Sequence, residues 1–170
     1  MNIKYYRKCK NIERLQGAFK HRTYNLMEHQ WGVAMLFRHF ASVEDIAYDI
    51  NVLDMVLHHD ILEVETTDLL YPIKNLNNKT KEAWGVIEGE VIKNHFQLDR
   101  YSDKNIKETL TESQFNLFKV CDLLDLWIFA KEEQAIGNSS ISIYEVIQNC
   151  EQLILGKYKM VDKFIKGYEF

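Results

Sequence analysis

Two histidines and two aspartates, far apart in the chain, have the residue types that hold a metal ion. They are His29, one histidine of the pair His58-His59, the adjoining Asp60, and Asp122. Imidazole nitrogens together with carboxylate oxygens suit Mn, Fe, Co, Ni or Zn better than Mg, which prefers oxygen alone. Four such ligands on an octahedral ion would leave two positions for water and a substrate oxygen. The set therefore predicts one divalent transition metal beside a substrate.

Each of these residues alone also has an ordinary structural interpretation. Asp122 lies in an apolar stripe of aromatic residues, so it should face the core, where a carboxylate needs a salt bridge or a metal. A lone His29 would more often be a hydrogen-bonded histidine than a metal ligand. Adjacent His58 and His59 point about 100° apart on a helix. Only one of them can readily share a site with Asp60.

The elements that must position these residues are expected to form an all-α helical bundle in a single domain, residues 1–170. One proline and seven glycines favour long helices with short connections. We expect a loop from Asp99 to Lys107. Helices are expected over residues 28–41, over 43–57 after Ser42 as N-cap, over 81–95 after Thr80 as N-cap, from the capping box at Thr111 to Gly137-Asn138, and over 143–154. Three of these helices place an ionisable residue against the interior, where helical bundles build metal sites.

Composition and charge exclude several classes of partner. A net charge of -4 provides no basic surface for a nucleic-acid polymer, although a nucleotide monomer needs only a metal and one or two cations. We see neither a signal peptide nor an apolar run of the roughly 18 residues that a membrane span needs. Three cysteines without CxxC spacing suit a reduced protein. We therefore expect a cytoplasmic protein without a membrane partner.

The order His29, His59-Asp60, Asp122 resembles the H…HD…D signature of HD-domain phosphohydrolases. The wider context resembles the bacterial 5'-deoxynucleotidase (YfbR-like) branch of that superfamily. Arg22 to His29 is similar to R-T-x-N-x-x-E-H, and His59 to Lys74 is similar to H-D-x-x-E-x-x-x-G-D-L-x-x-P-x-K. Asp122 is followed at the family's offsets by Lys131-Glu132-Glu133 and Gly137-Asn138. The likeness spans roughly Arg14 to Asn138.

The resemblance implies roles for individual residues around the metal. The metal ligands would be His29, His59, Asp60 and Asp122, with His59 chosen over His58 because it directly precedes the aspartate of the motif. Glu63 would position or deprotonate the attacking water. Asp68 would contribute to catalysis or hold the sugar. Asp125, one helical turn beyond Asp122, is expected to support the site or the packing.

The resemblance also assigns the substrate end of the site. Arg14 falls where the family places a phosphate-binding arginine, and Lys74 is either a second phosphate ligand or solvated surface. Arg22 either binds phosphate or caps the neighbouring helix. The family's tryptophan, linked with excluding a 2'-hydroxyl, is replaced by the sugar-facing Leu15, so selectivity for deoxyribose is left open. Thr67 replaces the glycine before the loop aspartate, so the local backbone is expected to differ.

We therefore expect a metal-dependent phosphomonoesterase that converts (deoxy)ribonucleoside 5'-monophosphates to nucleoside and phosphate. Glu63 would act as general base and then as acid toward the leaving 5'-oxygen, a task worth about 10²–10⁴-fold in rate. The alternative enzyme is a dNTP triphosphohydrolase that releases triphosphate. A non-catalytic helical binding protein is the alternative without chemistry. The resemblance also suggests a homodimer.

Overall fold

The computed structural model describes residues 3–68 and 76–168 of the chain. In that part the regular structure is helical, and the one extended pairing is an isolated β-bridge between Glu13 and Asn25. The all-α prediction is confirmed for the described residues. Among their helices, not one combines the length and apolarity that a bilayer crossing requires.

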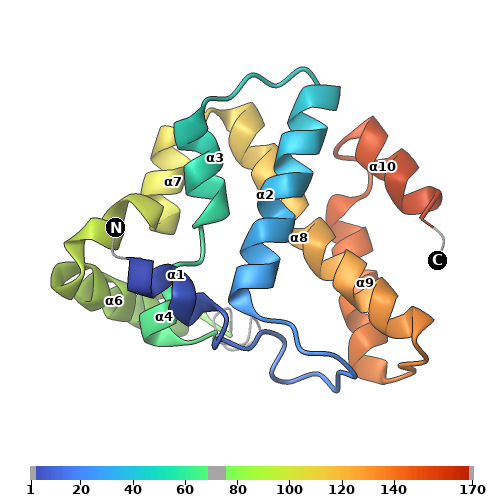
Figure 1. The fold of residues 1–170 in the computed structure, drawn as a ribbon, viewed down its shortest axis with the longest axis horizontal. Coiled ribbons are helices and arrows are strands. Elements are labelled where there is room, and N and C mark those ends of the chain that lie inside the picture. Colours follow the sequence, from blue (N-terminus) through green and yellow to red (C-terminus); the bar gives the residue numbers. More distant parts are fainter. Residues whose placement is uncertain (1–2, 69–75, 169–170) are drawn as a thin grey trace.

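Two long helices cross near the centre of the molecule. α2 (Leu26–Val43) packs against α8 (Glu112–Ala135), and α9 (Ile141–Ile154) also packs along α8 (Figure 1). α3 (Ile50–Leu57) lies beside α2, and α10 (Lys159–Lys166) contacts α2 from the C-terminal side. These five helices form the body that holds the histidines and Asp122.

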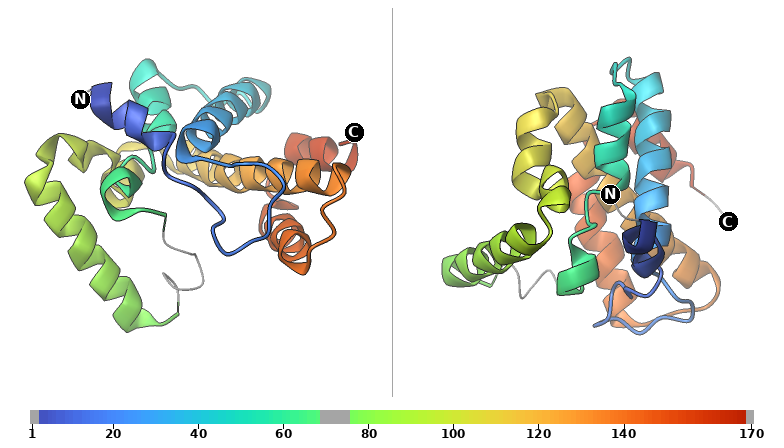
Figure 2. Two further views of the ribbon diagram at one scale, coloured as in Figure 1. Left: turned by 60° about the horizontal axis from the view of Figure 1, so that its bottom comes forward. Right: turned by 60° about the vertical axis from the view of Figure 1, so that its left-hand side comes forward.

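The remaining elements gather on the other side of α3. They are α1 (Ile3–Cys9), α4 (Glu63–Thr66), α6 (Asn78–Asn94), the 3-10 helix η1 (Phe96–Tyr101) and α7 (Asp103–Thr109). α6 stands away from the body (Figure 2). Its main contacts are with α4 and η1. Accordingly, none of its described side chains is fully buried.

The interior is divided into two apolar cores. The larger core packs α2, α3, α7, α8, α9 and α10 around residues such as Phe37 and Trp127, each worth about 2–3 kcal/mol of burial. The smaller core joins α1, η1 and the start of α2 through Leu26 and Leu98. α2 passes from the smaller core to the larger one, and the segment after α3 passes back. His29 and His59 lie at these two crossings.

Both ends of α8 follow the expected chemistry. Thr111 accepts a hydrogen bond from the Gln114 amide, and the Gln114 side chain accepts one from the Thr111 amide, which completes the predicted capping box. At the far end Gly137 has φ +95°, a left-handed conformation that glycine adopts without strain. Asn138 N–H then donates to the Glu133 carbonyl. The helix therefore begins and ends where the sequence predicted.

The predicted helix start at Ser42 is wrong. α2 continues through Val43, and α3 begins only at Ile50, capped by Asp49, whose side chain accepts from Val52 N–H. Asp45 adopts φ +54°, and Ile46 N–H donates back to the Ala41 carbonyl at 2.8 Å. This is the left-handed helix ending that glycine usually supplies. Because an aspartate instead of a glycine stands at this position, the end of the helix could not be recognised from the sequence.

Two further boundaries also differ from the prediction. Asn77, not Thr80, caps α6. Thr80 is the third helical residue, and its hydroxyl oxygen accepts a hydrogen bond from Asn77 N–H. The segment Asp99 to Lys107, expected as loop, belongs to η1 and α7, with Ser102 capping α7. Its charged side chains are exposed, while Tyr101, Ser102 and Ile106 are buried. Two apolar anchors therefore order a mostly polar segment.

Candidate metal centre

Two histidine rings meet at the seam between the two cores. His29 lies one turn into α2 and is fully buried, and His59 follows the end of α3 with 5% of its surface exposed. Their ring centroids are 5.2 Å apart in an edge-to-face arrangement. Asn25 fixes the start of α2 by accepting a hydrogen bond from Glu28 N–H. The position of His29 is therefore set by the helix cap.

The hydrogen bond of His59 determines which ring nitrogen is available. Its Nδ1 lies 2.8 Å from the Val56 carbonyl oxygen, which can only accept, so Nδ1 carries the proton. Nε2 is then the nitrogen that faces the site, where a bound metal would take the place of any proton on it. In the described part of the chain, the Nε2 atoms of His29 and His59 are buried without a hydrogen-bond partner. Buried polar atoms are costly in that state, and a cation between them would remove the cost.

Asp122 on α8 completes a group of three. Its Oδ1 lies 3.2 Å from His29 Nε2 and 3.7 Å from His59 Nε2. One ligand atom from each of the three residues lies within 4.8 Å of the others. Unpartnered imidazole nitrogens facing a carboxylate are the donor set of a transition-metal site. The residues present therefore fit a metal ion.

Asp60, the fourth predicted ligand, lies beside this group. Its Oδ2 is 3.3 Å from His59 Nε2 and 3.7 Å from His29 Nε2. The same oxygen accepts a hydrogen bond from Arg14 Nη1 at 2.8 Å. The three-residue cluster does not include it. The structure thus brings all four residues together, with Asp60 shared between the histidines and Arg14.

Electrostatics keep the carboxylates charged. Burial alone would raise the pKa of Asp122, but Lys119 and the two imidazoles hold it well below its usual range. Burial would likewise raise the pKa of Asp60, and His59 and Arg14 lower it well below its usual range. For His59, burial lowers the pKa, but the neighbouring carboxylates outweigh it and raise the pKa to about 10. The site therefore attracts positive charge at neutral pH.

Arg14 joins Asp60 to Glu63. Its Nη1 donates to Asp60 Oδ2 at 2.8 Å and to Glu63 Oε2 at 3.2 Å. Glu63 is the first residue of α4 and is 6% exposed. The backbone around Arg14 is fixed because its N–H donates to the Tyr24 carbonyl beside the β-bridge. Glu63, one turn after Asp60, and Arg14 therefore lie at the edge of the metal cluster.

Lys119 was missed by sequence reasoning. It lies one turn before Asp122 on α8, and its Nζ is 2.7 Å from Asp122 Oδ2. The Asp122 carboxylate raises the pKa of this lysine, so its ammonium group stays charged. The i, i+3 spacing of Lys119 and Asp122 is the signal that could have identified it. The site therefore has two cationic side chains, Arg14 and Lys119.

The other predicted residues have different outcomes. Asp68 is half-buried and follows Thr67, which has φ +63°, a backbone region that favours glycine. Leu15 is half-buried and also left-handed, with φ +51°. Lys74 lies outside the described residues. His58 is turned from the cluster: its Nδ1 lies 2.8 Å from the Asp54 carbonyl, and its ring contacts Tyr6.

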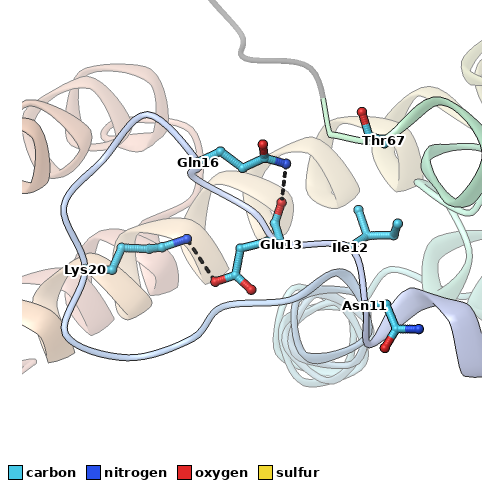
Figure 3. Close-up of a pocket in the computed structure, with 6 residues that line it drawn as sticks. All are labelled: Asn11, Ile12, Glu13, Gln16, Lys20 and Thr67. Carbon is cyan, nitrogen blue, oxygen red and sulfur yellow. Dashed lines mark hydrogen bonds and ion pairs between the residues drawn. The ribbon is translucent and has the colours of Figure 1, made fainter.

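A cavity of about 430 Å³ lies next to these loop residues. It is lined by Asn11, Ile12, Glu13, Gln16, Lys20 and Thr67 (Figure 3). Two contacts shape one wall: Lys20 Nζ lies 3.2 Å from Glu13 Oε1, and Gln16 Nε2 donates to the Glu13 carbonyl. The lining residues adjoin Arg14, Leu15 and Asp68 in the sequence. The cavity is therefore next to the segments assigned to substrate contacts.

A buried carboxylate anchors the loop that carries Arg14. Glu133 on α8 is fully buried and accepts hydrogen bonds from His21 N–H and Arg22 N–H. Asn138 donates to Glu133 and to the Phe19 carbonyl. The Arg22 side chain pairs with Glu132 at 2.6 Å. Arg22 therefore joins the loop to α8, and the family residues Glu133 and Asn138 hold it in place.

Glu133→Gln is expected to destabilise the protein by about 1–3 kcal/mol at pH 7, because charge-assisted bonds to buried donors are lost. Burial raises the pKa of Glu133, but the bonds from His21, Asn138 and Arg22 lower it below its usual range overall. A depressed folded-state pKa adds stability above the unfolded value of about 4.3, and that stability is lost as pH falls through the folded pKa. Urea unfolding at pH 7 and at pH 3.5 measures the difference, which should shrink at the lower pH. A difference that grows on acidification would contradict this role.

Comparison with known proteins identifies relatives over most of the chain. A family model described as 5'-deoxynucleotidase YfbR-like matches residues 2–168. The 5'-deoxynucleotidases YfbR of Escherichia coli O1:K1 and of E. coli strain UTI89 are each 26% identical to this chain over 130 residues. The match covers 69% of this chain and 65% of those proteins. The chain thus spans just under two thirds of the length of these curated relatives.

Solved structures share the fold. An HD-domain phosphohydrolase from Listeria innocua has a TM-score of 0.72 and 22% identity, covering 97% of this chain and 84% of that one. A cyanophage S-2L HD phosphohydrolase, solved bound to dA and one catalytic Zn2+ ion, has a TM-score of 0.67 and 21% identity, covering 90% and 82%. These likenesses show that the helical bundle is of the HD-domain type, as predicted.

Proposed function

Because the chain belongs to the YfbR-like 5'-deoxynucleotidase family, we propose that it is a metal-dependent phosphomonoesterase of nucleoside 5'-monophosphates, yielding a nucleoside and phosphate. One observation carries the proposal: buried, unpartnered Nε2 atoms of His29 and His59 converge on the Asp122 carboxylate from three separate segments. Such an arrangement is costly in a bundle interior unless a cation, either a metal ion or a proton, lies between the nitrogens and the carboxylate. The cluster is thus best explained as a functional site.

The metal would be held by His29, His59 and Asp122, with Asp60 as the fourth ligand. The donor set suits Mn, Co, Fe, Ni or Zn. When bound, a divalent ion lowers the pKa of a water molecule and neutralises charge on the phosphate. The catalytic zinc named for the cyanophage relative supports this assignment.

The chain's own side chains supply the rest of the chemistry. Arg14 presents a planar guanidinium at the edge of the cluster and can hold two phosphate oxygens, and Lys119 adds a point charge beside Asp122. Glu63 shares Arg14 with Asp60, and this closeness to the cluster supports a role for it beside the attacking water. It accepts a proton from that water and returns it to the leaving 5'-oxygen. Asp68 holds the sugar next to the cavity.

Substrate identity is tested with a panel of dNMPs, NMPs and dNTPs in the presence of Mn, Co, Zn or Mg. We expect orthophosphate from the monophosphates with at least one transition metal. Triphosphate released from dNTPs would instead identify the triphosphohydrolase. Substoichiometric metal in purified protein, together with no effect of chelator on melting, would favour a non-catalytic binding protein.

Leu15 is expected to leave the enzyme weakly selective between deoxyribose and ribose. Apolar contacts discriminate between substrates by about 10–200-fold. A leucine side chain covers less of the sugar than the family's tryptophan, so we expect kcat/KM for dNMP and NMP to differ by no more than the lower end of that range, about tenfold. Leu15→Trp should lower kcat/KM for the ribonucleotide and increase the ratio. Phe19→Trp, an aromatic enlargement at an exposed position of the same loop, is the matched control. An unchanged ratio in Leu15→Trp would remove Leu15 from the sugar site.

The homodimer and the cytoplasmic location stay predictions. Large apolar side chains on the outer face of α2, Met27 and Trp31, are 47% and 61% exposed and are available for a second subunit. Sedimentation equilibrium of the purified chain would distinguish a dimer from a monomer. A monomer at all concentrations would contradict the assembly without affecting the metal site.

A further inference from the structure

The Nδ1 atom of His29 is part of a hydrogen-bond network formed by His29, Tyr24 and Asp125. His29 Nδ1 lies 2.9 Å from Asp125 Oδ2 and 2.9 Å from the Tyr24 hydroxyl oxygen. The Tyr24 hydroxyl donates to the same Asp125 oxygen at 2.6 Å. A carboxylate can only accept, and the one phenolic proton already points to it. The network therefore favours a proton on Nδ1, and a metal bound beside Asp122 would then meet the Nε2 lone pair.

Gly32 leaves the space that Asp125 fills. A Cβ atom at position 32 would lie 1.9 Å from Asp125 Oδ1 and 2.8 Å from its Cγ, which no real structure tolerates. Gly32 lies three residues after His29, so both face the same side of α2. Glycine in the interior of a helix is less stable than alanine. The Asp125 carboxylate, resting against the bare backbone of α2, is a physical reason for this glycine.

Tyr24 is held rigidly enough to direct its hydroxyl. Its ring stacks on Phe129 of α8 at 4.2 Å between centroids, and 2% of the residue is exposed. Tyr24 comes from the loop, Gly32 from α2 and Asp125 from α8. Tyr24 and Asp125 thus contact His29 Nδ1 directly, and Gly32 leaves room for Asp125, whereas His59 Nδ1 has one partner, a backbone carbonyl.

We propose that Gly32, Asp125 and Tyr24 form a positioning unit that selects the tautomer of His29 and directs its Nε2 into the metal site. This inference rests on the proposed metal site and deepens it. The unit touches neither substrate nor metal; it acts through His29. Outer partners of a histidine ligand change metal affinity by about 10–100-fold when they are lost. Because Gly32 admits Asp125, the effects of these two positions should be coupled.

Zinc affinity of the full chain, measured by competition with a chromophoric chelator, tests the unit. Asp125→Ala and Gly32→Ala are each expected to weaken zinc binding by about 10–100-fold, and Tyr24→Phe by about tenfold. Gly32→Ala in the Asp125→Ala background should add no further loss, because the clashing carboxylate is gone. Gly89→Ala is the matched control, since no atom lies within 4 Å of a Cβ there; it should bind zinc like the wild type.

Long-range proton–nitrogen NMR of the imidazoles provides a readout that packing alone would not change. In the metal-free wild type, the proton of His29 should already be on Nδ1, and Asp125→Ala should lose that single tautomer. Variants that melt at lower temperature but bind zinc as tightly as the wild type would overturn the positioning unit alone. Wild-type protein that binds no zinc, manganese or cobalt would overturn the metal site and the unit with it.

Discussion

Asp122→Asn is expected to lose the bound metal and to release phosphate at least about 1,000-fold more slowly than the wild type. The asparagine keeps the size of the side chain but removes the charge that faces both Nε2 atoms, 3.2 and 3.7 Å away. A bound metal contributes several kcal/mol to transition-state stabilisation, and about 4 kcal/mol corresponds to that factor. Metal content by elemental analysis and initial rates on a dNMP measure the two effects together.

The control for this substitution is Asp45→Asn, because Asp45 is exposed and its left-handed backbone suits asparagine equally well. It should keep full metal content and activity. Asp60→Asn in the same assays separates two roles: loss of metal identifies a ligand, whereas a raised KM with metal retained identifies a support for Arg14. An Asp122→Asn protein with normal metal and normal rate would remove Asp122 from the site.

Glu63→Gln is expected to lower kcat by about 10²–10⁴-fold while metal content stays unchanged. Glutamine preserves the contact to Arg14 through its carbonyl oxygen but cannot take a proton from water. The wild-type Oε2 lies 3.2 Å from Arg14 Nη1, next to the metal cluster yet outside its three ligands. A large fall in kcat without metal loss is therefore the signature of proton transfer.

Glu65→Gln is the matched control, because Glu65 is an exposed glutamate on the same short helix and pairs with Lys8. We expect its kcat to equal that of the wild type. Loss of metal in Glu63→Gln would make Glu63 a ligand or a structural residue, and a kcat within threefold of the wild type would exclude proton transfer by this side chain.

The residue pattern could predict most of the helices and the residues that come together in the candidate metal site. The apolar period of Ala34, Phe37 and Ala41 located α2, and the capping box at Thr111 and the glycine at 137 located both ends of α8. These signals are local, so they can be read without knowing the tertiary structure. The order of His29, His59, Asp60 and Asp122 indicated a common site, and the structure places the four side chains together.

What was missed depends on tertiary contacts or on uncommon local chemistry. The end of α2 at Asp45 has no sequence signal, since glycine is the usual residue there. Ile50 has the helical spacing of an apolar position relative to Leu53 and Leu57, but it is the first residue of α3 and is 74% exposed. Trp31 is likewise exposed on the outer face of α2. Periodicity alone does not say where a helix starts or which neighbours cover it.

The partners of the site were also invisible in the sequence. The roles of Gly32 and Tyr24 become apparent only from their contacts with Asp125. Asp125 lies about 100 residues later in the chain, across the α2–α8 crossing. Arg14 was assigned to phosphate, yet in the structure it also holds two carboxylates of the site. Such pairings arise from helix packing between the two cores, which one sequence does not encode in any local pattern.

Anomalous diffraction from crystals grown with zinc or cobalt tests the central claim most directly. One strong peak per chain is expected about 2.0–2.3 Å from His29 Nε2, His59 Nε2 and an Asp122 oxygen, the range of metal–nitrogen and metal–oxygen bonds. Asp122→Asn crystals should lack it. A wild-type map without a peak there, or with its only strong peak bound by other residues, would contradict the metal centre and the phosphatase built on it.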